Sequence, residues 1–171
     1  CENKGDIFFL GDKESGTFGL LPLALSPGGD GRFTSLVPVF LAPTELQSRL
    51  QKKPMLVVMT WSTASSLDAP TSALLDQYTQ QGGNLMVLPA VDGGKSAGKP
   101  PAWIGADRGS LQTAPVSVPL RIAGAQSEFW FDLRGLDGRV RLGNAFTRKY
   151  HPLSFGQDAG YVPLLATGED H

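Results

Sequence analysis

The first half of the chain alternates short apolar runs with segments whose apolar positions repeat at helical spacing. Ile7–Leu10, Met55–Met59 and Asn84–Leu88 are almost entirely apolar, which is typical of strands buried on both faces of a parallel sheet. A further run, Leu36–Leu41, contains Pro38. Because proline lacks a backbone donor, this run is predicted to be an edge or bulged strand.

Helices are predicted between these strands. Thr44 can cap one of them, with Gln47 three residues further on as a capping box requires. A second helix starts after Asp68, a suitable N-cap, with Pro70 in its first turn. The short apolar segment Phe18–Leu25 predicts one more helical piece. Strands and helices that alternate at this spacing imply right-handed crossovers and a parallel α/β sheet.

The pattern changes beyond the βαβαβ half, which comprises residues 1–91. Residues 92–115 are rich in Gly, Pro and Ala, and a stretch of this length predicts a long loop. Residues 116–171 are predicted to be β-rich, with short apolar or alternating segments at Ser117–Ile122, Glu128–Leu133, Arg139–Leu142 and Val162–Ala166. The expected organisation is one α/β domain, residues 1–171, with a β-rich C-terminal portion.

The composition is that of a neutral globular domain. The chain has 171 residues, of which 41% are hydrophobic and 18% charged, and its net charge is -1. Lysine and arginine are scattered, so nucleic acid is not an expected partner. No apolar run approaches the roughly 18 residues of a membrane span, and no membrane contact by this segment itself is expected. Cys1 is either a lipidated anchor or the point where the chain was cut from a longer protein; the short distance to the first strand favours the second.

Motifs for cofactors are weak or missing. Gly93–Lys99 has the G-x-x-x-x-G-K spacing of a phosphate loop, but Pro100–Pro101 follow where that motif needs a hydroxyl residue and a helix. The chain has no H-x-x-x-H or C-x-x-C pair. Neither cofactor nor metal is therefore expected, although Asp6, Asp12 and Asp30 leave open an acidic magnesium pocket at the carboxyl edge of the sheet.

Polar and aromatic side chains follow the predicted strands at that same edge. Asp12 comes after the first strand, Trp61 and Ser62 lie in the predicted loop after the central strand, and Asp92 follows the next. Ligands of open α/β sheets bind at this edge, so these four residues form the candidate ligand or partner edge. A serine nucleophile needs a base, and one alternative pairs Ser62 with His151.

The stretch from Leu56 to Ala90, LVVMTWSTASSLDAPTSALLDQYTQQGGNLMVLPA, resembles class I glutamine amidotransferase-like domains. These share a strand, a loop, a helix ending in l-x-x-y-x-x-x-G-G, and a strand of the form lxvlp; the matching positions are Leu75, Tyr78, Gly82, Gly83, Leu85 and Val87. The later stretches VPLRIAGAQSEFWFDLRG and YVPLLATGEDH look similar to the variety embedded in large bacterial membrane-anchored proteins. Those proteins also carry von Willebrand A-type domains and an N-terminal double-transmembrane segment. The resemblance implies a flavodoxin-like parallel sheet with helices on both faces.

The resemblance does not imply the family's activity. Active members place a cysteine in the elbow after a central strand and a His and Glu later, whereas neither Thr60–Ser62 nor Pro89–Asp92 contains cysteine. It therefore implies a non-enzymatic pseudoenzyme that acts as a binding or scaffolding module. This module would be the soluble part of a membrane-tethered protein of the bacterial cell envelope, and its partners would be a protein or other domains of the parent chain.

Two alternatives remain. One is a hydrolase that acts through Ser62 or through an acidic metal site. The other is a carbohydrate-binding accessory domain, which would need at least two exposed tryptophans among Trp61, Trp103 and Trp130.

Overall fold

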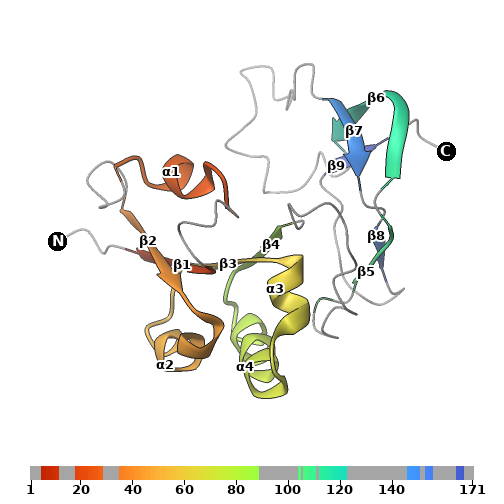
Figure 1. Ribbon diagram of the computed structural model, residues 1–171. Helices are drawn as coiled ribbons and strands as arrows, with labels where there is room; N and C mark the ends of the chain where they lie inside the picture. Colours follow the sequence, from red (N-terminus) through yellow and green to blue (C-terminus); the bar gives the residue numbers. More distant parts are fainter. Residues whose placement is uncertain are drawn as a thin grey trace. The chain divides into compact units, whose positions relative to one another are not determined.

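The computed structural model describes residues 5–11, 18–28, 35–88, 104, 106–110, 112–122, 146–150, 153–155 and 165–167. The chain folds into two compact units, which comprise Cys1–Ile104 and Gly105–His171. Each unit is described by itself below (Figure 1). The assignment of the whole chain to one domain stays a prediction.

A parallel sheet of four strands forms the centre of the first unit. Its strands lie in the spatial order β2-β1-β3-β4, and every neighbouring pair is parallel. Their bounds are β1 Gly5–Leu10, β2 Leu36–Leu41, β3 Leu56–Thr60 and β4 Leu85–Leu88. The chain adds β2 on one side of β1 and then crosses to the other side for β3 and β4, as in flavodoxin-like sheets. The predicted α/β class is confirmed.

Helices cover both faces of this sheet. They are α1 (Leu21–Leu25), α2 (Leu46–Leu50) preceded by the 3-10 turn η1 (Pro43–Glu45), α3 (Trp61–Ser66) and α4 (Ala69–Gln80). Figure 1 shows α1 on one side of the sheet and α2 with α4 on the other. Right-handed crossovers require helices on both faces. The connection from β1 to β2 runs across the sheet in one direction, and the connections from β2 to β3 and from β3 to β4 run in the other.

The starts of the helices follow local capping chemistry. Asp68 caps α4 as predicted, since its Oδ1 accepts the backbone N–H of Thr71 at 2.9 Å. The predicted capping box of Thr44 and Gln47 is wrong. The helical turn begins earlier, at a proline in its first position, and the Glu45 carboxylate accepts the N–H of Ala42 at 2.9 Å.

Apolar side chains fill both faces of the sheet at its two inner strands, β1 and β3, as predicted. The prediction that Asn84–Leu88 is also buried on both faces is wrong, because β4 lies at an end of the described sheet and Met86 is 38% exposed. On the α1 face, Ile7, Phe9 and Val58 are buried together with Phe18. The Phe9 ring meets Phe18 edge to face, with centroids 5.0 Å apart, and stacks on Phe40 at 5.2 Å. Strand residues alternate between faces, so the equally buried Phe8, Leu10, Val57 and Met59 point to the α2 and α4 side, where Leu46 and Leu75 are buried.

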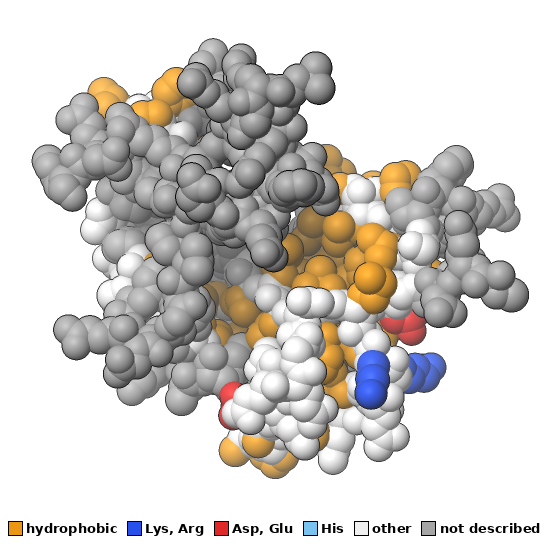
Figure 2. Space-filling view, turned by 180° about the vertical axis from the view of Figure 1, so that it is seen from behind, with side chains coloured by type: hydrophobic (Ala, Val, Ile, Leu, Met, Phe, Trp, Pro, Cys, Tyr) orange, Lys and Arg blue, Asp and Glu red, His pale blue; other side chains and the backbone are white. Residues whose placement is uncertain are grey.

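The outer surface at α1 is also apolar. Leu21 and Leu25 pack against the core cluster, but Leu20 and Leu23 are 76% and 57% exposed. In Figure 2, hydrophobic side chains gather on the face that the first unit presents to the viewer.

Pro38 explains why β2 lies at an end of the sheet. The N–H of Gly5 donates to the carbonyl of Ser35 at 2.7 Å, and that of Gly11 donates to Leu41 at 3.0 Å. In a parallel pair alternate residues bond to the neighbouring strand, so the odd-numbered residues of β2 bond to β1. The backbone nitrogen of Pro38 therefore faces away from β1, where its lack of an N–H breaks no hydrogen bond of the sheet. The prediction of an edge strand is confirmed.

The turn from α4 to β4 depends on close packing around Tyr78. Its hydroxyl donates to the carbonyl of Pro54 at 2.9 Å, which ties the end of α4 to the residues before β3. A Cβ atom on Gly83 would overlap the Tyr78 ring, and Gly82 has a φ of +85°. Glycine is therefore favoured at 82 by the backbone conformation and at 83 by the close approach of the Tyr78 ring.

The second unit is β-rich, as predicted. Its strands are β5 (Ala106–Arg108), β6 (Gln112–Ile122), β7 (Phe146–Tyr150), β8 (Leu153–Phe155) and β9 (Leu165–Thr167). All the pairs are antiparallel: β5 with β8, and β6 with both β7 and β9. Among the described residues, none of the helices has the length and apolar character needed to cross a bilayer.

Two of these strands begin inside residues 92–115, so the prediction of a loop throughout that stretch is wrong. β5 lies wholly within it and β6 starts at Gln112. They pair with β7 and β8, and the nearest paired residues, Pro119 and Phe146, are 27 positions apart. Local composition does not reveal pairing over that separation. The predicted strands at 128–133 and 139–142 lie outside the described residues.

Candidate functional site

The candidate site lies where β1 and β3 end side by side. Strand addition changes direction between these two strands, and in open α/β sheets ligands bind at the carboxyl end of such a switch point. β1 ends at Leu10, and β3 ends at Thr60 with Trp61 and Ser62 directly after it. The structure therefore places Trp61 and Ser62 at the predicted edge. The other two members of that edge, Asp12 and Asp92, lie outside the described residues.

The segment after β3 is helical, so the expectation of a loop there is wrong. Thr60 has an extended backbone, with φ of -88° and ψ of 163°, and its Oγ1 accepts the N–H of Thr63 at 3.1 Å. This is the geometry of an N-cap, and it starts α3 at Trp61 without an intervening loop. The capping residue was missed, although a threonine followed by further hydroxyl residues after an apolar strand is a recognisable helix start.

Three side-chain hydroxyls meet at this cap and are called the hydroxyl cluster: Thr60, Ser62 and Thr63. The Oγ1 of Thr60 lies 2.9 Å from the Oγ of Ser62 and 2.9 Å from the Oγ1 of Thr63. Thr60 is only 2% exposed, whereas Ser62 and Thr63 are half-buried and reach the surface. The buried hydroxyl thus links the hydroxyls of two partly exposed residues.

The hydrogen-bonding capacity of the Thr60 hydroxyl determines how many donors the hydroxyl cluster can offer to a ligand. A hydroxyl has one proton and two lone pairs, and one lone pair of Thr60 is taken by the N–H of Thr63. Of Ser62 and Thr63, one must therefore donate its proton to Thr60 and the other must accept the Thr60 proton. The hydroxyl that accepts the Thr60 proton still has its own proton to donate to a ligand. The hydroxyl that donates to Thr60 has no proton left and can only accept a hydrogen bond from a ligand. The cluster therefore offers a ligand one donor and, beside it, one acceptor.

In the part of the chain that the structure describes, the side-chain partner of the Ser62 hydroxyl is not the base that an activated nucleophile needs. This hydroxyl contacts another alcohol, which is not a base that can remove its proton at neutral pH. Nucleophile elbows hold their serine in a sharp, strained turn. Among the described residues, Lys53 with φ of 50° is the only non-glycine with positive φ. His151, the base of the hydrolase alternative, lies outside the described residues.

Trp61 is a packing residue at this edge. It is 7% exposed, so its ring offers no open face to a sugar. The carbohydrate-binding alternative then depends on Trp103 and Trp130, both of which lie outside the described residues.

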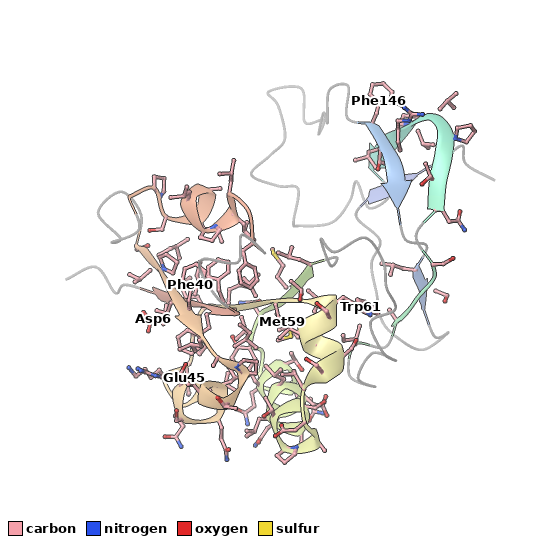
Figure 3. All side chains as sticks on the ribbon, in the orientation of Figure 1. Asp6, Phe40, Glu45, Met59, Trp61 and Phe146 are labelled. Atoms are coloured by element: carbon pink, nitrogen blue, oxygen red, sulfur yellow. The ribbon has the colours of Figure 1, made fainter. Side chains whose placement is uncertain are left out.

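Asp6 does not belong to the carboxyl edge. It lies near the amino end of β1, paired with Val37, and at about 3.3 Å per residue it is roughly 13 Å from Leu10 along the strand. Figure 3 shows Asp6 and Trp61 toward opposite ends of the sheet. The acidic magnesium pocket is therefore wrong for Asp6, and its other members, Asp12 and Asp30, lie outside the described residues. Within the described part of the chain, no three His, Cys, Asp or Glu side chains form a group able to hold a metal ion.

The shifted pKa values belong to groups that hold the ends of α4. Hydrogen bonds from the side chain and backbone of Thr71 lower the pKa of Asp68. Burial raises the pKa of Tyr78, whose hydroxyl contacts the carbonyls of Pro54 and Asn84. Both groups serve helix geometry, so these two shifts do not single out a reacting group.

No family model, curated protein or solved structure matches the chain. The amidotransferase-like resemblance stays a prediction. The structure gives most of the residues that carry it a packing or turn-forming role: Leu75 is fully buried, and Tyr78, Gly82 and Gly83 shape one turn. In this chain, these positions therefore form a helix–turn–strand connection.

Proposed function

We propose that this chain is a non-catalytic binding module whose ligand or partner meets the carboxyl edge of the four-stranded sheet at the hydroxyl cluster, with Ser62 toward the ligand and the buried Trp61 packed beside it. The observation that carries the proposal is the hydroxyl cluster, which lies at the switch point of the sheet and has its buried member fully hydrogen-bonded within the protein. Because the hydrogen bonds of Thr60 are complete within the protein, the Ser62 and Thr63 hydroxyls can be held in place to orient a ligand. The same contacts give Ser62 no base that would activate it as a nucleophile.

The number of donors and acceptors in the hydroxyl cluster also favours a neutral polar ligand over an anion. An anion such as a carboxylate only accepts hydrogen bonds, and the three hydroxyls offer it one donor. A neutral group that carries a donor and an acceptor side by side, such as a primary amide, matches both outer hydroxyls at once. The proposed ligand or partner group is therefore neutral and polar.

A matched pair of probes tests this preference. Acetamide and acetate have nearly the same shape, but only the amide can donate. We expect acetamide, titrated at millimolar concentration into the labelled full chain, to shift the backbone amide signals of Ser62 and Thr63 more than acetate does. Ser62→Ala should abolish the difference, whereas Ser48→Ala, which removes an exposed hydroxyl that donates to the Glu45 carbonyl, should keep it. A larger response to acetate would overturn the preference.

The hydrolase alternative is tested by turnover. The full chain is incubated with glutamine and with generic amide and ester substrates, and product is followed over time. Turnover that Ser62→Ala removes and Ser48→Ala leaves intact would replace the binding module with an enzyme. Absence of turnover together with the acetamide response supports the module.

We further propose that the parent protein is a membrane-tethered protein of the bacterial cell envelope and that this segment is a catalytically silent amidotransferase-like domain within it. The support is the resemblance of Leu56–Ala90 and of the later stretches, together with the missing cysteine at Thr60–Ser62. The test is the sequence encoded on either side of this segment. Transmembrane segments and a von Willebrand A-type domain on the same chain would support the proposal, and a parent chain without them would refute it.

A further inference from the structure

No further inference is drawn: the strongest candidate, the apolar outer surface at α1 with its exposed Leu20 and Leu23, carries nothing because nothing in the structure shows what covers it.

Discussion

Replacing Thr60 with valine tests whether one buried hydroxyl organises the candidate site. Valine keeps the shape of threonine and its preference for extended backbone, so the end of β3 should be retained. The substitution removes the acceptor for the N–H of Thr63 and the common partner of the Ser62 and Thr63 hydroxyls. The start of α3 would then have no side-chain cap.

The magnitude follows from these three contacts. Loss of a threonine N-cap costs about 1 kcal/mol. The hydroxyls of Ser62 and Thr63 are half-buried and can turn to water, so their two lost bonds add roughly 1 kcal/mol together. The total for Thr60→Val is about 2 kcal/mol. Thr60→Ser keeps all three contacts and loses one buried methyl group, which costs about 0.8 kcal/mol.

Urea unfolding of the full chain, followed by far-UV circular dichroism, compares the two variants with the parent. We expect Thr60→Val to be the less stable variant and to speed hydrogen exchange at the Thr63 amide, while Thr60→Ser leaves that exchange close to the parent rate. If Thr60→Val is as stable as Thr60→Ser, or if the Thr63 amide exchanges equally in both, the hydroxyl does not organise the site.

Three further substitutions test the scaffold that positions this edge. Pro38→Val restores an outward N–H on the apolar edge strand β2, and we expect sedimentation velocity to detect stronger concentration-dependent self-association than in the parent; an unchanged sedimentation profile would refute the role of this proline. Gly83→Ala forces a methyl group into the ring of Tyr78 and should destabilise the chain to urea by about 1–3 kcal/mol, with partial recovery when Tyr78→Leu is added; equal losses in both variants would contradict the steric account. The pKa of Asp68 is lowered in the folded state, so its stabilisation is complete above the unfolded-state pKa of about 3.9 and declines as pH falls through the lower folded-state pKa. Asp68→Asn should therefore flatten the acid limb of the urea midpoint between about pH 5 and pH 2, and a limb identical to that of the parent would contradict this assignment.

The residues on which the predicted amidotransferase-like resemblance rests show how a motif can describe a fold without describing an activity. Gly82 and Gly83 are fixed by a positive φ and by the approach of the Tyr78 ring. Any chain that makes this tight turn between a helix and a parallel strand meets the same steric demand. Such a motif supports a prediction of architecture, and evidence about chemistry has to come from the residues at the carboxyl edge.

The sequence alone determined the features that depend on near neighbours. The continuous apolar runs of β1 and β3 predicted inner strands that the structure buries on both faces, Pro38 predicted the edge strand, and Asp68 predicted the cap of α4. Each depends on the chemistry of a few consecutive residues, because backbone donors, strand faces and helix caps are satisfied locally.

Tertiary structure decided the contents of the site. The sequence predicted that Trp61 and Ser62 lie at the carboxyl edge. It did not predict the burial of Trp61, the linking role of Thr60 or the position of Asp6 toward the other end of β1. It also did not predict that β5 and β6 would pair with strands far along the chain. Burial depends on which surfaces the remaining elements bring together, and register depends on partners distant in the sequence. For that reason two neighbouring residues in the same hydroxyl-rich segment, Trp61 and Ser62, have opposite roles: one fills the core and the other faces the proposed ligand.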